Sequence, residues 1–434
     1  MRKRTIILTL MLTLLMFASL ASLAEESYSG FSKSAGRKSG TATKSLTTLR
    51  TSSTGTLSTV TATLTTTVTI TLTTTVTETV TTTSTIDGSG SVDVELSRLH
   101  TDGRWIKDST GNIVRLKGAA VFWRFIYSSH YHDYDPLSYN DEINETSLDT
   151  FKSAGANFIR LELNGWIWYV KRAPKYVEAV DKVISWCKAR KIMVVLDNHQ
   201  WYDMDSGFMY KDQYALATQL TEWKNFMLEL AERYKNEPTV IGFDMLNEPL
   251  GYPHNGLDWN TWRTNVLEVI RAVHAVDPTY LCFVEPLGSS AEKDDMNNFK
   301  TTPLPEPNIV YSAHIYYAWD YPYQEYAINY GRGNFELAKQ QMEALYYERF
   351  LDMLDAGLPA LIMETGVYRD YSKNPNWEVW ISDSLALYEK YNAGVCWLPS
   401  SPDRSDSSLI STLSPDRSSL TDVGAIWAMY MNSG

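Results

Sequence analysis

The stretches VIGFDMLNEP, at residues 240–249, and PALIMETG, at residues 359–366, each place a glutamate directly after a hydrophobic run. Short apolar runs of this kind are typical of buried β-strands. The two glutamates are Glu248 and Glu364. A carboxylate at the end of a buried strand costs desolvation free energy unless neighbouring groups stabilise it, so the pair indicates a functional pocket.

Runs of the same kind recur along the chain from about residue 97 onward. Eight strands are predicted, at 114–121, 158–163, 192–197, 240–246, 280–285, 309–315, 360–364 and 394–398. Amphipathic stretches typical of helices lie at 176–190, 215–234, 259–276, 335–354, 377–391 and 422–431. Alternating β and α units over roughly 250 residues or more are typical of a (β/α)8 TIM barrel. We therefore expect an α/β fold with one TIM-barrel catalytic domain at 97–434.

A doubly wound open sheet would show the same alternation of strands and helices. In a TIM barrel, however, functional groups come from the carboxyl ends of several strands. Polar side chains stand within or just after six consecutive predicted strands, and they include Arg160, His199, Asn247, Glu248, Glu285, His314, Tyr316 and Glu364. An open sheet offers no reason for this distribution, so the barrel is the preferred interpretation.

Two carboxyl groups on opposite walls of a barrel mouth suit the hydrolysis of a glycosidic bond with retention of configuration. That reaction needs one carboxylic acid to protonate the leaving oxygen and one carboxylate to attack the anomeric carbon, at a separation of roughly 5–5.5 Å. We predict Glu248 as the acid/base and Glu364 as the nucleophile. Both steps use only carboxylates and water, so the sequence predicts no cofactor and no metal ion.

Five neighbouring residues are predicted to support this chemistry. Asn247 is expected to hydrogen-bond the sugar 2-hydroxyl, while Arg160 and Tyr316 are expected to keep the nucleophile charged. His199 and His314 are expected to orient the sugar or the acid. For any one of them, an ordinary polar residue at a strand end is an equally good interpretation. The convergence of several on one face of the barrel favours catalysis.

Five short motifs carry a resemblance to a known family. They are FIRL at 158–161, VLDNH at 195–199, GFDMLNEP at 242–249, YSAHIY at 311–316 and ETG at 364–366. From its second to its seventh strand the domain resembles family five of the glycoside hydrolases, which are retaining barrels with glutamates after strands four and seven. The resemblance implies the family's roles for Arg160, His199, Asn247, Glu248, His314, Tyr316 and Glu364, with Glu248 as acid/base and Glu364 as nucleophile.

Within that family, the GFD…NEP and YSAH segments and the closing SPD…SLI at 401–410 look most like endo-β-1,4-glucanases. Cellulose or another β-1,4-glucan is therefore the implied substrate. Trp201, just after His199, is expected to contact the sugar. Trp397 is a further candidate sugar platform, although the family often has a Trp pair before Asn-Pro-Asp where this chain has WLPSSPD at 397–403. This departure leaves the alignment of Trp397 open by one or two positions.

The first 96 residues differ from the rest in composition. Residues 1–24 join a basic start, RKR at 2–4, to a largely apolar stretch that ends in SLA at 22–24. This pattern is typical of an export signal peptide, although the apolar stretch is about as long as the roughly 20 residues that span a bilayer, so an uncleaved membrane anchor is the alternative. Residues 25–96 are dominated by Ser and Thr, which predicts a disordered stalk. We expect a secreted protein, with tethering to the cell surface as the alternative.

The chain carries a formal net charge of −12, which argues against nucleic acid and suits an enzyme that acts on an uncharged polymer. We expect a monomer whose partner is its polysaccharide substrate. Two alternatives stay open. One is a β-mannanase or β-1,3-glucanase of the same family, since loop shape decides which sugar fits. The other is a catalytically inactive barrel that binds carbohydrate.

Overall fold

The computed structural model describes residues 63–71, 77–85, 96–121, 125, 135–139, 143–170, 172–200, 216–249, 258–287, 293–368, 372–398, 412–414 and 416–432. The backbone contacts divide the chain into two compact units, Met1–Asp93 and Val94–Gly434. The predicted signal peptide lies outside the described residues, as do Trp201 and the whole SPD…SLI segment.

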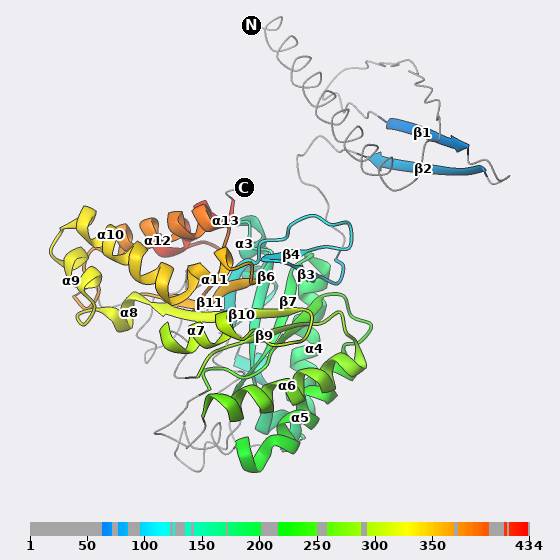
Figure 1. The fold of residues 1–434 in the computed structure, drawn as a ribbon, viewed down its shortest axis with the longest axis horizontal. Helices are drawn as coiled ribbons and strands as arrows, with labels where there is room; N and C mark the ends of the chain where they lie inside the picture. The colour runs from blue at the N-terminus through cyan, green and yellow to red at the C-terminus, as the bar shows by residue number, and fades with distance from the viewer. Residues whose placement is uncertain are drawn as a thin grey trace, which may run out of the picture. The chain divides into compact units, whose positions relative to one another are not determined.

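Eight parallel strands of the second unit close into a barrel (Figure 1). The strands are β5 (Lys117–Val121), β6 (Phe158–Asn164), β7 (Met193–Gln200), β8 (Val240–Asp244), β9 (Leu281–Val284), β10 (Ile309–Tyr316), β11 (Ala360–Gly366) and β12 (Gly394–Trp397). Each strand pairs with the next along the chain, and β12 pairs with β5 to close the ring. The eight strands and the TIM-barrel fold predicted from the sequence are confirmed.

The first barrel strand is shorter than predicted. Residues from 114 onward were expected to extend, but β5 begins at Lys117. The backbone N–H of Val114 instead donates to the carbonyl of Ile106, at 2.8 Å, and Ile113 forms a bridge with Lys107. These residues pair with the short hairpin of β3 (His100–Asp102) and β4 (Trp105–Lys107). Their extended backbone therefore belongs to the hairpin and not to the barrel.

Helices cover the outside of the barrel (Figure 1). They are α3 (Glu145–Ser153), α4 (Pro174–Ala189), α5 (Leu216–Arg233), α6 (Trp259–Val276), α7 (Lys293–Thr301), α8 (Tyr317–Asp320), α9 (Glu325–Gly331), α10 (Phe335–Tyr346), α11 (Asp352–Asp355), α12 (Trp377–Tyr391) and α13 (Asp422–Met431). The single helix predicted at 335–354 is instead α10 and α11 joined by a π-helical turn at Tyr347–Leu351. Among the helices that the structure describes, none has the length and apolar character needed to cross a membrane.

Side chains alternate between two faces along each barrel strand, as the β pleat requires. On β6, Ile159 and Leu161 belong to the large core cluster that the strands share with the helices. Phe158 belongs to a second cluster, together with Val195 and Ile241 of the neighbouring strands. The second cluster fills the interior of the barrel toward the amino-terminal ends of its strands. Arg160, two residues after Phe158, therefore faces the interior one layer nearer the carboxyl ends of the strands.

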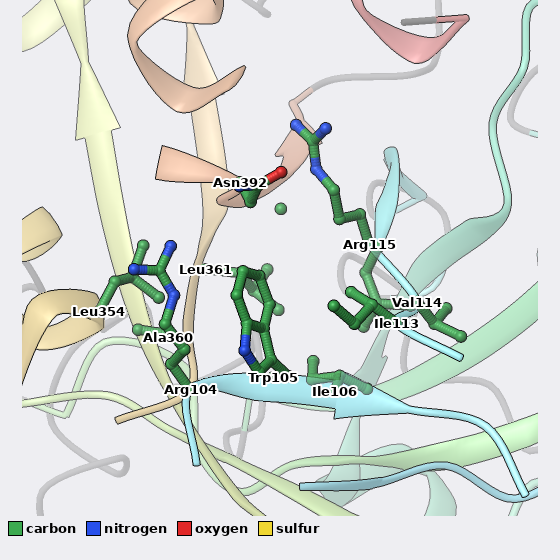
Figure 2. Close-up of a pocket in the computed structure, with 12 residues that line it drawn as sticks. Arg104, Trp105, Ile106, Ile113, Val114, Arg115, Leu354, Ala360, Leu361 and Asn392 are labelled. Carbon is green, nitrogen blue, oxygen red and sulfur yellow. The ribbon is translucent and has the colours of Figure 1, made fainter. Parts of the chain in front are cut away.

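The amino-terminal end of the barrel carries a separate pocket (Figure 2). Trp105 and Ile106 of the β3–β4 hairpin line it, together with Leu116, Ala360 and Gly394, which lie where barrel strands begin. The carboxylates of the predicted site lie at the opposite ends of the strands. Because this face of a TIM barrel serves stability, we interpret the pocket as the seam between the hairpin and the barrel floor.

The described residues of the first unit form one pair of antiparallel strands, β1 (Thr63–Thr71) and β2 (Thr77–Thr85), with Thr67 opposite Thr81. They lie within the segment that the sequence predicted as a disordered stalk, so the structure adds local β-pairing to that prediction. The physical reason is that Thr and Val are β-branched and favour extended backbone. Two strands alone form no hydrophobic core.

Candidate active site

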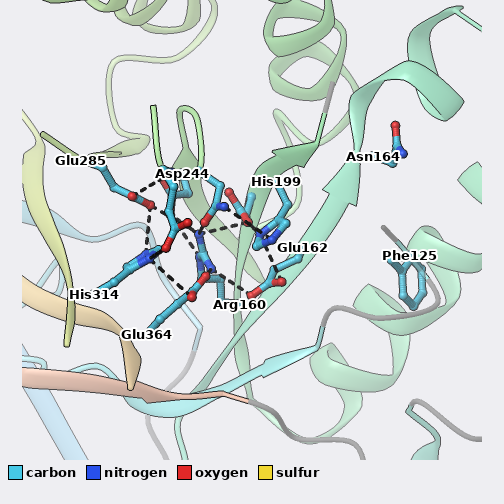
Figure 3. A network of polar contacts seen from close by, with 12 residues as sticks. Phe125, Arg160, Glu162, Asn164, His199, Asp244, Glu285, His314 and Glu364 are labelled. Carbon is cyan, nitrogen blue, oxygen red and sulfur yellow. Dashed lines mark hydrogen bonds and ion pairs between the residues drawn. The ribbon is translucent and has the colours of Figure 1, made fainter. Parts of the chain in front are cut away.

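Arg160 occupies the centre of the site (Figure 3). Among the described residues, five carboxylates lie within 3.6 Å of its guanidinium nitrogens, and they are Glu162, Asp197, Asp244, Glu285 and Glu364. The arginine side chain is completely buried. A buried cation is stable only when paired, and a guanidinium offers five N–H donors in a fixed fork. Arg160 therefore ties strand ends from five different strands or their following loops to one point.

Glu364, on β11, is held by two donors from different strands. Arg160 donates from Nη1 to Oε1, and the Tyr316 hydroxyl donates to Oε2 at 2.5 Å. Burial by itself would raise the pKa of the Glu364 carboxyl, but the positive charges of His314 and Arg160 outweigh it and lower that pKa to about 2. Glu364 is thus an ionised carboxylate at neutral pH, which is the state that a nucleophile requires.

Glu248 lies just past β8 in a different environment. Its side chain is 34% exposed, against 5% for Glu364. His314 Nδ1 hydrogen-bonds Glu248 Oε1 at 2.8 Å, which leaves the other carboxyl oxygen free to carry a proton. The Glu248 backbone has a φ of 41°, in the left-handed region that a non-glycine residue enters only at a cost. Backbone strain of this kind is concentrated at functional sites.

The two glutamates face each other across a short gap. Carboxylate oxygens of Glu248 and Glu364 and a ring nitrogen of His314 all lie within 4.8 Å of one another. His314 Nδ1 is 3.4 Å from Glu364 Oε2, so one imidazole contacts both carboxylates. Burial by itself would lower the pKa of His314, but the charges of Glu285 and Glu364 raise it well above its usual range. His314 is therefore an imidazolium between the two acids.

His199 and Asn247 lie on the other side of Arg160. Burial lowers the pKa of His199 to about 4, so its ring is neutral at neutral pH. His199 Nδ1 lies 2.8 Å from Asp197 Oδ2, and Nε2 lies 3.5 Å from Asn247 Nδ2. Arg160 Nη2 donates to Asn247 Oδ1 at 2.9 Å. This contact fixes the Asn247 amide so that its N–H groups point away from the arginine, as a donor to a sugar hydroxyl must.

The structure thus brings together seven of the residues predicted from the sequence, which are Arg160, His199, Asn247, Glu248, His314, Tyr316 and Glu364. It does not bring Trp397 to the site. That ring is completely buried in the core cluster shared with the helices, while its neighbours Cys396 and Leu398 belong to the cluster inside the barrel. Strand alternation therefore turns Trp397 away from the barrel mouth. Trp201 lies outside the described residues.

Sequence reasoning assigned no role to four further acids of the site, Glu162, Asp197, Asp244 and Glu285. All four are completely buried. Burial raises the pKa of each carboxyl against the lowering effect of nearby cations, to about 7 for Asp244. The period of two along a strand could have found Glu162, which follows Arg160 by two residues on β6 and so shares its face.

The same acids raise the question of a metal site. Ligand atoms of Glu162, Asp197 and His199 lie within 4.8 Å of one another, as do those of Glu248, His314 and Glu364. In the first group Arg160 already pairs with both carboxylates. In the second group His314 Nδ1 already hydrogen-bonds Glu248 and lies 3.4 Å from Glu364. The donor sets therefore suit proton transfer between paired charges better than metal coordination.

Comparison with known proteins gives consistent results. The family model "Cellulase (glycosyl hydrolase family 5)" matches residues 108–402. An endoglucanase of Paenibacillus polymyxa is 28% identical over 252 residues, which is 50% of this chain and 59% of that protein. Endoglucanase G of Acetivibrio thermocellus is 23% identical over 390 residues, 70% of this chain and 66% of that protein. The match thus spans less than two thirds of the length of either relative.

Solved structures share the fold. A β-glucanase from Saccharophagus degradans, crystallised in complex with cellotetraose, superposes with a TM-score of 0.62 at 18% identity, over 78% of this chain and 94% of that one. The family model covers well over half of the chain, including every residue of the site described above. The chain is therefore a glycoside hydrolase that belongs to the cellulases of glycosyl hydrolase family 5.

Proposed function

We propose that this hydrolase is an exported endo-β-1,4-glucanase that cleaves cellulose or a related β-1,4-glucan with retention of anomeric configuration. The observation that carries the mechanism is the closeness of the two glutamates, since one carboxylate oxygen of Glu248 lies within 4.8 Å of one carboxylate oxygen of Glu364. Retaining glycosidases place their carboxyl groups roughly 5–5.5 Å apart, whereas inverting enzymes need roughly 6.5–9.5 Å to fit a water molecule. The short distance favours direct attack on the sugar.

In the first step Glu364 attacks the anomeric carbon and forms an ester bond with it. The glycosidic bond breaks, and Glu248 gives its proton to the departing oxygen, so the leaving chain departs as a neutral alcohol. Arg160 and Tyr316 hold the two oxygens of Glu364 in place, which fixes the direction of attack. When the ester forms, Glu364 loses its negative charge, and the contacts of Arg160 and Tyr316 with its oxygens must accommodate this change.

In the second step Glu248 acts as a base. It takes a proton from water, the resulting hydroxide equivalent attacks the anomeric carbon, and Glu364 leaves as a carboxylate. Each step inverts the configuration at the anomeric carbon, so the two steps together retain it. The greater exposure of Glu248 supports this assignment, because the acid/base must exchange its proton with solvent-borne water while the nucleophile need not.

Two observations support a β-1,4-glucan as substrate. The relatives reported above are named endoglucanases, and one related fold holds cellotetraose, a β-1,4-linked glucose oligomer. The mannanase and β-1,3-glucanase alternatives would use the same two glutamates. The alternative of an inactive barrel is disfavoured because side-chain donors orient both glutamates. Arg160 and Tyr316 contact Glu364, and His314 contacts Glu248. We expect the enzyme to act as a monomer, because one chain supplies both proposed catalytic groups.

The substrate assignment predicts a clear preference among soluble polysaccharides. We expect reducing-sugar release from carboxymethylcellulose to exceed release from mannan and laminarin, together with an early fall in viscosity because internal bonds are cut first. Proton NMR of the first products should show the β-anomer before mutarotation. Preference for mannan or laminarin would change the substrate and keep the mechanism, whereas a first-formed α-anomer would contradict the mechanism.

We further propose that the chain is exported and then either released or left tethered by residues 1–24. The basic start, the apolar stretch and the SLA ending support this proposal. Amino-terminal sequencing of the exported protein is expected to begin at or near Glu25 if the signal is cleaved. A protein that is exported but begins at residue 1 or 2 would indicate an anchor, and retention of all activity inside cells would contradict export.

A further inference from the structure

Glu285 is an acid for which the two-glutamate mechanism has no step. It follows β9 directly and is completely buried. Its backbone carbonyl accepts a hydrogen bond from Trp262 Nε1 of α6 at 3.1 Å, so the residue is anchored from the helix layer. A fully buried carboxyl is costly unless it serves a neighbour. The neighbours of Glu285 are the two groups on which the proposed acid/base depends.

The first neighbour is the backbone of Glu248. The Glu248 N–H donates to Glu285 Oε2 at 2.9 Å. This is the residue whose φ of 41° lies in the left-handed region. A hydrogen bond from that N–H to a fixed carboxylate stabilises the strained conformation, and this conformation determines where the Glu248 side chain points.

The second neighbour is the ring of His314. Glu285 Oε1 lies 3.1 Å from His314 Nε2, while the opposite nitrogen, Nδ1, contacts Glu248 Oε1 and Glu364 Oε2. The imidazolium thus lies between Glu285 and Glu364 (Figure 3). Its Nδ1 side also contacts Glu248. A ring held at both nitrogens cannot rotate without breaking a contact. Glu285 is therefore in a position to fix both the orientation and the proton of His314.

We propose that Glu285 is a positioning residue for the hydrolysis, which holds the Glu248 backbone in its left-handed conformation and anchors the far nitrogen of His314. This inference rests on the roles proposed for Glu248 and Glu364. It adds an acid that follows β9 to a site whose proposed catalytic acids lie just after β8, for Glu248, and on β11, for Glu364. The alternative is a buried acid that contributes to stability alone.

The charged groups around His314 and Glu285 set the direction of the pH effect. Glu248, Glu285 and Glu364 face the His314 ring, and Arg160 on β6, Asp197 on β7 and Asp244 on β8 lie near Glu285. Removing the Glu285 charge lowers the pKa of His314, so the imidazolium gives up its proton at lower pH. Above that pH the neutral ring no longer donates from both nitrogens to the carboxylates around it, so the alkaline limb of the activity profile moves to lower pH.

The test compares Glu285→Gln and Glu285→Ala with the wild-type chain. Gln keeps an oxygen that can accept from the Glu248 N–H but lacks the charge, whereas Ala lacks both. We measure kcat/KM across pH with two β-cellobiosides, one with an acidic phenol as leaving group and one with an unactivated alcohol. A misplaced acid should cost about 10²-fold with the unactivated substrate and less than about tenfold with the activated one, because a good leaving group needs little protonation.

We expect both variants to move the alkaline limb downward by about one pH unit, and Ala to show the larger leaving-group effect. The matched control is Glu389→Gln, a glutamate that pairs with Arg115 through two contacts of 2.8 Å away from the site. It should change neither the limb nor the leaving-group ratio. The proposal would be overturned if the wild type is active and both Glu285 variants keep its pH limb and its ratio of kcat/KM between the two substrates.

A readout independent of activity covers the case in which the roles of the glutamates are wrong. In 15N-histidine NMR of the full chain, assigned with His314→Asn, the His314 ring should lose its proton at a lower pH in Glu285→Gln than in wild type. An unchanged titration would overturn the anchoring of His314. A wild type that hydrolyses no glycan would instead overturn the proposed function, whatever the titration shows.

Discussion

Replacing Glu364 with glutamine is expected to abolish hydrolysis while leaving the fold intact. The amide cannot form the ester with the anomeric carbon, so kcat should fall on the order of 10⁴-fold or more. Glutamine has nearly the same shape. Its carbonyl oxygen can still accept the hydrogen bond that Arg160 donates to Glu364 Oε1 in the wild-type chain. Reducing-sugar release from carboxymethylcellulose measures the first effect, and the midpoint of thermal unfolding measures the second.

The control for this variant is again Glu389→Gln, the same chemical change at an ion pair outside the site. Its activity should stay close to that of wild type. If Glu364→Gln kept a tenth or more of the wild-type rate, Glu364 would not be the nucleophile. If it unfolded at a much lower temperature, the loss of activity would have to be measured again below that temperature.

Removal of Arg160 is expected to produce the largest loss of stability. The side chain is completely buried and is the cation shared by the carboxylates around it. Breaking one buried ion pair costs about 3–5 kcal/mol, and Arg160→Gln leaves several carboxyls without their partner. We expect the free energy of unfolding at pH 7 to fall by at least about this amount, measured by urea unfolding followed through tryptophan fluorescence.

The loss caused by Arg160→Gln should depend on pH, with a sign that follows from the acids of the site. Burial raises the pKa of Asp244 from 3.8 to about 7, so the folded state binds more protons than the unfolded state between these values. Stability therefore falls as pH rises through this window. Arg160 opposes that trend by lowering the pKa of Asp244, so its removal should cost more at pH 7 than at pH 4.

A matched arginine provides the control for this stability experiment. Arg233 pairs with Asp181 at the surface, where the two side chains are 41% and 38% exposed. Arg233→Gln should cost about 0–1 kcal/mol, with little change between pH 4 and pH 7. Equal losses for Arg160→Gln at both pH values would show that packing, rather than charge, accounts for its effect.

The barrel itself was predictable from the sequence because strand periodicity is strong in a buried parallel sheet. All eight strands occur, and the helices α6, α12 and α13 have the predicted bounds. The missed elements are those whose pairing depends on distant segments. The β3–β4 hairpin pairs with Ile113 and Val114, and the sequence assigned the second of these to the first barrel strand.

The site was predictable where a residue follows a strand and less so where its orientation depends on the pleat. Glu248 and Glu364 stand out because each ends a hydrophobic run. Glu162 was missed because nothing in its local sequence marks it, although its spacing from Arg160 places both on one face. Trp397 was misplaced for the same reason, since strand alternation puts its two neighbours inside the barrel and its own ring outside.

The central claim is that Glu364 forms a covalent bond with the sugar. A 2-deoxy-2-fluoro-β-cellobioside with a good leaving group tests it directly, because fluorine slows both the formation and the breakdown of the glycosyl ester. The good leaving group restores the rate of formation alone, so the ester accumulates. Mass spectrometry of the digested protein should then find one fluorocellobiosyl group on the peptide that contains Glu364, and none in Glu364→Gln. A label on another acid, such as Glu162 or Glu285, would contradict the account, as would steady turnover with no labelled peptide.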